Sequence, residues 1–257
     1  MQAHLADLVH AYVGAFGVVF PQAKDSGGFL DHLEPDVRQR IDGRVRQMRV
    51  RKGQIVIDHG SNGGDVYCVL EGEFDVCVYS PQGREVYLRR ISRGALFGEY
   101  AALDGGRRSA TVAAASDALL AVICRTDFVD CLTTSPGVTL WLARQLAVHV
   151  RELTEKIFEL SALNVRSRLH CELMRLCLAA GVTANTAVID PAPTHADLAN
   201  RIGTHREAVT RELNDLATLK IVSQKNRRLA ILDVARLSLL VEVTGGDLGV
   251  AEQGGTA

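Results

Sequence analysis

The stretch that most constrains this chain covers residues 97–112, where a short apolar run lies between glycines. A glycine pair, Arg108-Ser109 and a β-branched strand start follow the run. Glycines and small residues let backbone N–H groups converge on an anion. Arg108 supplies a forked donor for a phosphate, with the Ser109 hydroxyl beside it. Glu99, at the opposite end, would repel phosphate but can accept a bond from a sugar hydroxyl. The stretch therefore predicts a sugar-phosphate site, the alternative being an ordinary charged turn.

The order of residues in this stretch also carries a resemblance. Phe-Gly-Glu, followed nine residues after the glutamate by Arg-Ser-Ala-Thr-Val, resembles the phosphate-binding cassette of the cyclic-nucleotide-binding domain in bacterial cyclic-AMP receptor proteins and kinase regulatory subunits. The resemblance implies Glu99 on the ribose 2′-hydroxyl, and Arg108 and Ser109 on the cyclic phosphate. Tyr100 departs from the pattern, which has an aliphatic residue there. The candidate ligand residues in this stretch are Phe97, Gly98, Glu99, Tyr100, Arg108, Ser109 and Ala110.

Size and composition allow more than one domain. The chain has 257 residues, enough for two domains of ordinary size, and 47% of them are hydrophobic. The formal net charge is only −1, so any contact with nucleic acid has to come from local clusters of basic residues.

Cysteine usage and hydropathy indicate the compartment. The six cysteines show no C-x-x-C spacing and four lie inside apolar runs, so we expect no disulfide framework and a reducing environment. The longest apolar run, Ala11–Phe20, is too short to span a bilayer, and no secretory signal is evident. We therefore expect a soluble, cytoplasmic protein without a membrane partner.

Patterning divides the chain into five parts. Residues 1–28 show helical spacing of apolar residues and predict an amphipathic helix with a short linker. Residues 29–134 consist of short segments divided by glycines, which predict an antiparallel sandwich or roll; the resemblance favours the β-roll. The segments that read as strands are Gln54–Asp58, Asp65–Leu70, Glu73–Tyr79, Val86–Leu88 and residues 111–122.

Residues 135–163 predict one long helix that begins after Ser135-Pro136. Its apolar residues advance by fours and threes, as in a two-stranded coiled coil, although a single buried helix carries a similar pattern. The resemblance favours the homodimer. We call this set the apolar stripe; it comprises Leu142, Leu146, Val150, Leu153, Ile157 and Leu160.

The same helix is where the family's receptor proteins read adenine, with an adjacent Thr-Ser pair. The matching pair here is Leu153-Thr154. The resemblance implies that Thr154 reaches the purine held by the other subunit, the alternative being a solvent-facing threonine. Leu153 offers no polar group, so one contact to the adenine amino group is missing. We expect cyclic AMP as the effector, with cyclic GMP a serious competitor.

Residues 164–243 predict a winged helix-turn-helix, and residues 244–257, rich in glycine, a disordered tail. A helix over 164–181 follows a hinge near Asn164. Thr194 with Asp197 forms a capping box, Gly203 lies in the tight turn, and Thr204 caps the second helix.

The second helix is predicted over His205–Leu213, and its residues from Arg206 to Arg211 match the family's recognition-helix pattern Arg-Glu-x-Val-x-Arg. Arginine pairs with guanine O6 and N7, and glutamate accepts from a cytosine amino group. Basic residues in the hairpin-like segment that follows suit a wing on phosphates. The alternative is a charged, solvated helix and a basic turn. The candidate DNA contacts are Thr194, Thr204, His205, Arg206, Glu207, Thr210, Arg211, Lys225, Arg227 and Arg228.

Together these features predict an α+β protein: a homodimeric transcription regulator, gated by a cyclic nucleotide, that binds a palindromic TGTGA-like site on double-stranded DNA and works with RNA polymerase. No nucleophile elbow, phosphate-binding Walker motif or metal-ligand cluster is present in the sequence, so we expect no enzyme. Two alternatives stay open. One is a member of the same superfamily that binds DNA without a cyclic nucleotide or senses another effector. The other is a regulatory subunit without DNA function.

Overall fold

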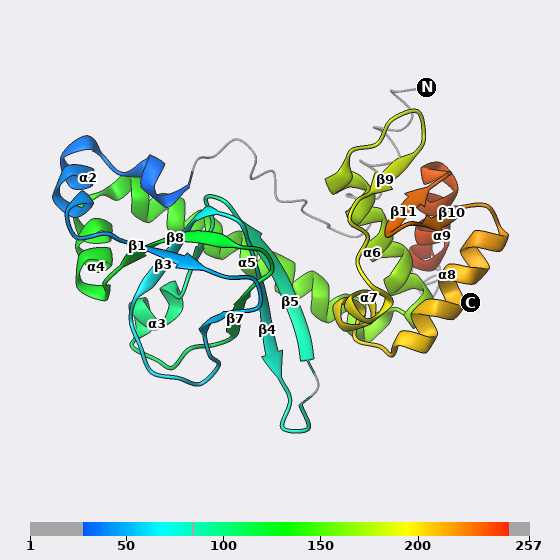
Figure 1. Ribbon diagram of the computed structural model, residues 1–257, viewed down its shortest axis with the longest axis horizontal. Helices are drawn as coiled ribbons and strands as arrows, with labels where there is room; N and C mark the ends of the chain where they lie inside the picture. The colour runs from blue at the N-terminus through cyan, green and yellow to red at the C-terminus, as the bar shows by residue number, and fades with distance from the viewer. Residues whose placement is uncertain (1–27, 84, 247–257) are drawn as a thin grey trace, which may run out of the picture. The chain divides into compact units, whose positions relative to one another are not determined.

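The computed structural model describes residues 28–83 and 85–246 (Figure 1). They belong to two compact units, and the division between them falls inside the long helix α5 (Pro136–Ala162), after His149. Apart from Gly28, the helix predicted for residues 1–28 lies outside the described residues. None of the described helices is both long enough and apolar enough to cross a lipid bilayer.

The first unit is built from two four-stranded antiparallel sheets. The first sheet contains, in order, β1 (Arg46–Val50), β8 (Ala118–Ile123), β3 (Val66–Glu71) and β6 (Leu96–Phe97). The second contains, in order, β2 (Ile55–Ile57), β7 (Thr111–Ala114), β4 (Glu73–Tyr79) and β5 (Glu85–Ser92). A core of residues from both sheets, including the fully buried Phe74 and Leu120, lies between them. The predicted antiparallel β-roll is confirmed.

Helices close one end of the roll. Figure 1 shows α2 (Pro35–Asp42), which the sequence did not predict, beside α4 (Arg125–Thr134). The ring of Phe29, from the 3-10 turn η1 (Phe29–His32), lies 5.5 Å from that of Phe128 on α4. It lies 6.0 Å from the ring of Trp141 on α5. The first turns of α5 are therefore part of the core of this unit.

One turn shows why this roll needs a glycine. Gly72 joins β3 to β4 with a φ of 87°, and a Cβ there would lie 2.6 Å from the carbonyl oxygen of Asp117. Only glycine adopts this backbone without strain and allows so close an approach.

The second unit contains the predicted helix-turn-helix. Its elements are α6 (Val165–Ala180), β9 (Ala187–Ile189), α7 (His195–Ile202), α8 (Arg206–Thr218), β10 (Val222–Lys225), β11 (Arg228–Ile231) and α9 (Val234–Gly246). The helix α6 begins where Asn164 accepts a bond from the backbone of Ser167 at 3.0 Å, and it ends at Gly181, as predicted. The strand β9 was not predicted, and α9 continues to Gly246, so the first three residues of the segment predicted as a disordered tail belong to this helix.

The apolar stripe of α5 is divided. Leu142 is buried in the core of the roll, with Leu146 packed against it. From Val150 onward the stripe is uncovered: Val150 is 63% exposed and Ile157 is 66% exposed. Within the part of the chain that the structure describes, this half of α5 is therefore not buried.

Candidate nucleotide and DNA sites

Gly98 and Arg108 build the centre of the cassette. At the end of β6, Gly98 adopts a φ of 85°. Its carbonyl oxygen accepts a 2.8 Å bond from Nη1 of Arg108, while Nη2 of Arg108 donates to the carbonyl oxygen of Asp65, also at 2.8 Å. A Cβ at Gly98 would lie 2.7 Å from that Nη1. The glycine is required both for its backbone and for the approach of the arginine.

Glu99 is the first residue of α3 (Glu99–Asp104), and it is only 3% exposed. Burial raises the pKa of its carboxyl group, whereas a bond from its own backbone N–H and the nearby Arg89 and Arg108 lower it. Arg108 is itself buried, and Ser109 beside it is exposed. Glu99 and Arg108 are therefore both buried and interact electrostatically, and a role for Glu99, Arg108 and Ser109 in ligand binding stays a prediction.

Two of the predicted ligand residues lie in the core. Phe97 is buried and stacks on Tyr67, with ring centroids 5.0 Å apart and planes at 12°. Ala110 is also buried. Both side chains belong to the core between the two sheets, and their contact with a ligand stays a prediction.

Tyr100 leads to two residues that the sequence did not identify. Its hydroxyl lies 3.3 Å from Nδ1 of His149 on α5, and Nε2 of His149 contacts Nη1 of Arg89 on β5. Of the two new residues, His149 lies on α5, far from the cassette in sequence, whereas Arg89 lies on β5, shortly before it. The only signal for them in the sequence was Tyr100 itself, which stands where the family pattern has an aliphatic residue.

Leu153 and Thr154 lie on the uncovered part of α5. Leu153 is 47% exposed. The Thr154 hydroxyl donates to the carbonyl oxygen of Val150 at 2.9 Å. A hydroxyl bonded to its own helix can still accept a bond from a ligand.

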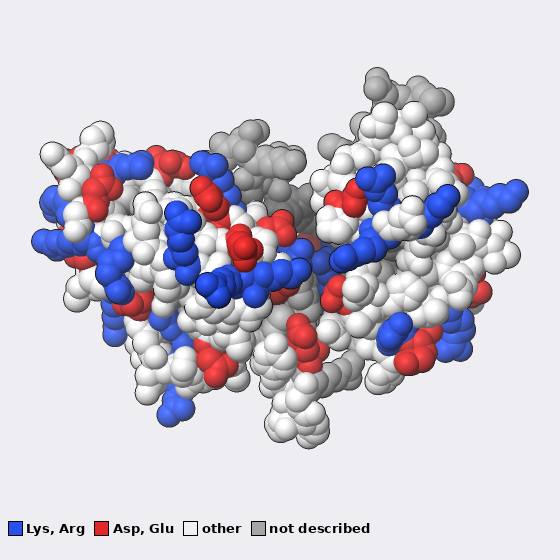
Figure 2. Space-filling model, viewed as in Figure 1, with Lys and Arg blue, Asp and Glu red and all other residues white. Residues whose placement is uncertain are grey.

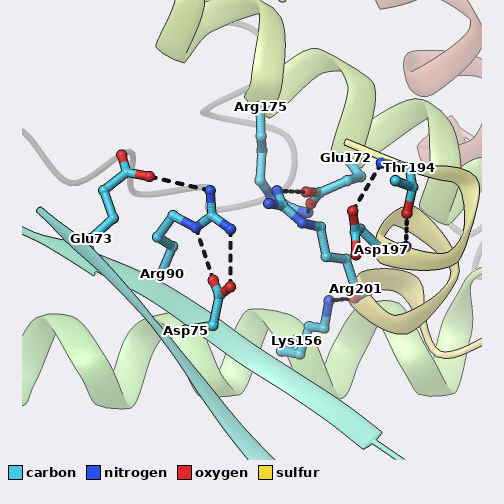
Figure 3. Close-up of polar contacts among 9 residues, drawn as sticks. All are labelled: Glu73, Asp75, Arg90, Lys156, Glu172, Arg175, Thr194, Asp197 and Arg201. Carbon is cyan, nitrogen blue, oxygen red and sulfur yellow. Dashed lines mark hydrogen bonds and ion pairs between the residues drawn. The ribbon is translucent and has the colours of Figure 1, made fainter. Parts of the chain in front are cut away.

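In the second unit, the first helix of the helix-turn-helix begins at the predicted capping box. Thr194 Oγ1 accepts from the Asp197 backbone at 3.1 Å, and Asp197 accepts from the Thr194 backbone at 2.9 Å (Figure 3). Gly203 ends the helix with a φ of 66°. The prediction that Thr204 caps α8 is wrong, because the cap residue is His205. The backbone N–H of Thr204 instead donates to the carbonyl oxygen of Ala199 at 2.9 Å, in the turn between the two helices.

The helix α8 has a buried side and an exposed side. Val209, Leu213 and Leu216 are buried beneath the helix. One surface hollow is lined by Arg206, Glu207, Thr210, Arg211 and Asn214. The sequence missed Asn214, although it lies one helical turn beyond Thr210 on the same face.

His195 joins this face to the wing. Its Nδ1 lies 2.7 Å from the Thr210 hydroxyl on α8, and its Nε2 lies 3.2 Å from the side-chain oxygen of Gln224 on β10. Neither His195 nor Gln224 was a predicted site residue. Through these two hydrogen bonds, the first residue of α7 connects the exposed side of α8 to the wing.

The predicted wing is the β10–β11 hairpin. Lys225 pairs with Arg228, and the two residues between them, Asn226 and Arg227, have φ values of 51° and 60°, as a tight hairpin turn requires. Arg228 donates to Asp190 at 2.7 Å, so it is partly neutralised. Lys225 and Arg227 are exposed, and neither forms an ion pair with an acidic residue in the part of the chain that the structure describes. Of the predicted basic contacts on the hairpin, these two suit DNA phosphates best.

Buried ion pairs fasten α7 to the end of α5 and to α6. Glu172 accepts from Arg201 at 2.9 Å and from Arg175 at 3.0 Å (Figure 3). Arg175 also pairs with the buried Glu159, and the Lys156 ammonium contacts the carbonyl oxygen of Arg201. We call these five side chains the joint network. Its bonds bridge the break between α5 and α6 near Asn164.

On one face of the molecule, charged side chains of both signs lie close together. On the face that Figure 2 shows, acidic and basic side chains intermingle over both units, in keeping with a net charge of −1. On this face, a local set of basic residues on α8 and the wing is the candidate for contact with DNA.

Comparison with known families covers both sites. Residues 47–135 match the model of the cyclic nucleotide-binding domain, and residues 167–240 match that of the Crp-like helix-turn-helix domain. The fold and these matches define a DNA-binding transcription regulator that carries a cyclic-nucleotide-binding domain.

Similar proteins agree with this class. The cyclic AMP receptor protein of Thermus thermophilus is 31% identical over 197 residues, 76% of this chain and 86% of that protein. A CRP-like cAMP-activated global transcriptional regulator of Mycobacterium tuberculosis is 22% identical over 212 residues, 82% of this chain and 95% of that protein. The chain belongs to the superfamily of cyclic-AMP receptor proteins and fumarate-nitrate regulators.

A solved structure supports the fold. The c-di-GMP responsive global regulator CLP of Xanthomonas campestris has a TM-score of 0.68 at 19% identity, and the alignment covers 77% of this chain and 99% of that one.

Proposed function

We propose that this protein is a homodimeric regulator whose DNA binding is gated by a cyclic purine nucleotide, cyclic AMP in the first place with cyclic GMP as a competitor. The observation that carries the proposal is the cassette: a buried Glu99 facing a buried Arg108, whose guanidinium is held by two backbone carbonyls. A fixed guanidinium beside the Ser109 hydroxyl suits a phosphate diester, and a buried carboxylate suits a ribose hydroxyl. The relatives named for cyclic AMP support the same ligand class.

The proposed dimer would bury the uncovered part of the apolar stripe against the same stripe of a second copy. Val150, Leu153, Ile157 and Leu160 are each more than 40% exposed and share one helix. Residues at this spacing interdigitate when two parallel helices wind around each other. The two-fold axis would set the two recognition helices into successive major grooves, ~34 Å apart.

Ile157→Asp is expected to break this dimer. A charge at the centre of the stripe removes one apolar anchor and has to be desolvated, so dimerisation should weaken by about 2 kcal/mol or more, roughly thirtyfold. Analytical ultracentrifugation across a concentration series measures the change. Leu140→Asp is the matched control, because Leu140 is 53% exposed on the same helix but lies outside the stripe. A monomeric parent protein, or equal effects of both variants, would contradict the dimer proposal.

Base selectivity should be modest because Leu153 lacks a polar group. Thr154 and Ser109 are then the hydroxyls that can read the purine, and Ser109 can also meet the amino group of a guanine. Isothermal titration with cyclic AMP and with cyclic GMP tests the ligand class. We expect both to bind, cyclic AMP more tightly. A thousandfold preference for cyclic AMP that survives Thr154→Ala would contradict this view of the pocket.

If the folded dimer bound neither nucleotide, the proposed effector would be wrong, and the alternative of a family member that responds to another effector would take its place.

DNA and RNA polymerase are the proposed macromolecular partners, with a palindromic TGTGA-like site as the DNA target. Bound nucleotide shifts the population toward a DNA-competent arrangement only if it binds that arrangement more tightly.

A further inference from the structure

A second arginine stands beside the cassette, outside its motif. Arg89 lies on β5, and its Nη1 donates to Nε2 of His149 on α5. Its charge also acts on the buried carboxyl group of Glu99, where it opposes the effect of burial. No part of the function proposed above uses Arg89.

The partner of Arg89 is a neutral group. A guanidinium only donates, so Nε2 of His149 accepts and the ring proton lies on Nδ1, which donates to the Tyr100 oxygen at 3.3 Å. Burial, and then Arg89, lower the pKa of His149 to about 4, so the imidazole is uncharged at neutral pH. His149 therefore holds the guanidinium in place without cancelling its charge, as a carboxylate would.

The balance of negative and positive groups at the site indicates a role for Arg89. A cyclic nucleotide brings one negative charge to a site that already contains Glu99. Arg108 alone would face two negative groups, and a carboxyl group buried under those conditions tends to take up a proton. With Arg89 present, two guanidinium groups face two negative groups. Within the described residues, the charges that act on Glu99 are those of Arg89 on β5 and Arg108 before β7, and Arg89 in turn contacts His149 on α5, whose Nδ1 lies 3.3 Å from the Tyr100 hydroxyl on α3.

We propose that Arg89 is a positioning residue of the nucleotide site: fixed by His149 and Tyr100, it sets an uncancelled positive charge against Glu99, so that Glu99 receives the ribose hydroxyl as a carboxylate. The inference rests on the proposed cyclic-nucleotide function and deepens it. If so, three elements, β5, α3 and α5, have to be correctly positioned relative to one another before the ligand binds tightly.

Titration of cyclic AMP at a series of pH values between about 5 and 9 tests this inference. In Arg89→Gln, we expect affinity at neutral pH to fall about tenfold or more, the scale of one lost charge interaction. Without the nearby positive charge, Glu99 protonates at a higher pH. The midpoint below which affinity falls should therefore move to higher pH than in the parent protein. Arg89→Lys keeps the charge and should keep a midpoint near that of the parent.

The matched control is Arg90→Gln, on the next residue of the same strand. Arg90 pairs with Asp75 at 2.8 Å and with Glu73 at 3.3 Å (Figure 3), so its loss should change neither affinity nor midpoint. Parent-like binding by Arg89→Gln, while Arg108→Ala loses the ligand, would overturn this inference and leave the proposed function standing. An equal loss at every pH in both Arg89 variants would also overturn it, since that result indicates packing alone. A folded parent that binds neither nucleotide would overturn both.

Discussion

Arg108→Ala is expected to reduce the affinity for cyclic AMP at least ten- to a hundredfold. The guanidinium is buried, and two carbonyl oxygens hold it at 2.8 Å, so its orientation toward a phosphate is fixed before the ligand arrives. Losing such a charge-assisted contact costs ~1.5–3 kcal/mol or more. Isothermal titration of the parent and of the variant measures the effect directly.

Arg107→Ala is the control for this prediction. Arg107 is the preceding residue, exposed, and it donates to the Gly60 carbonyl oxygen at 3.3 Å. The control variant should bind like the parent protein. Circular dichroism should show that Arg108→Ala keeps its fold; if it does not, Glu99→Ala, which removes the proposed sugar contact, takes its place. Unchanged affinity in a folded Arg108→Ala variant would refute the cassette assignment.

The second large effect is expected at the recognition helix. Arg206→Ala should relax the preference at one guanine position of each half-site, because each good arginine–guanine pair supplies ~1–3 kcal/mol of discrimination. Arg206 is exposed in the hollow on α8, together with Glu207 and Arg211. Gel-shift titrations against the TGTGA-like site and against single-base variants of it measure the preference, with and without cyclic AMP.

Lys225→Ala provides the contrast. Lys225 is exposed on the wing and should contact a phosphate, so its loss should weaken binding to all sequences alike and reduce the salt slope by about 1. If both variants lost affinity uniformly and added nucleotide changed nothing, the recognition-helix assignment and the gating proposal would both be wrong.

The sequence predicted the elements with strong alternation or clear boundary signals. The strand Glu73–Tyr79 was predicted with its observed bounds, because glycine precedes it and apolar residues alternate along it. The strand β1 was missed: its residues Arg46 to Val50 are mostly polar, and a single residue of the strand is buried. The strand β9 has three residues and depends on pairing with β11, a long-range contact without a local signal.

At the candidate nucleotide site, too, long-range contacts leave no local signal in the sequence. Gly98, Glu99, Arg108 and Ser109 lie within one short segment, so their residue types and spacing were enough to predict them as ligand residues. Arg89 and His149 reach the site from β5 and α5, and only the pairing of strands and the packing of α5 bring them there. Tyr100 was recognised as unusual, but its meaning depends on these two residues.

The joint network has a consequence for how salt titrations are interpreted. Its carboxylates, Glu159 and Glu172, are 5% and 7% exposed, so mobile ions screen these pairs far less than surface pairs. Raising the salt concentration should leave the α5–α6 connection intact while it displaces the protein from DNA. The slope of log K against log salt should therefore reflect the counterions released by Lys225, Arg227 and their neighbours at the phosphates, at ~0.9 per neutralised charge, without a contribution from a loosening protein.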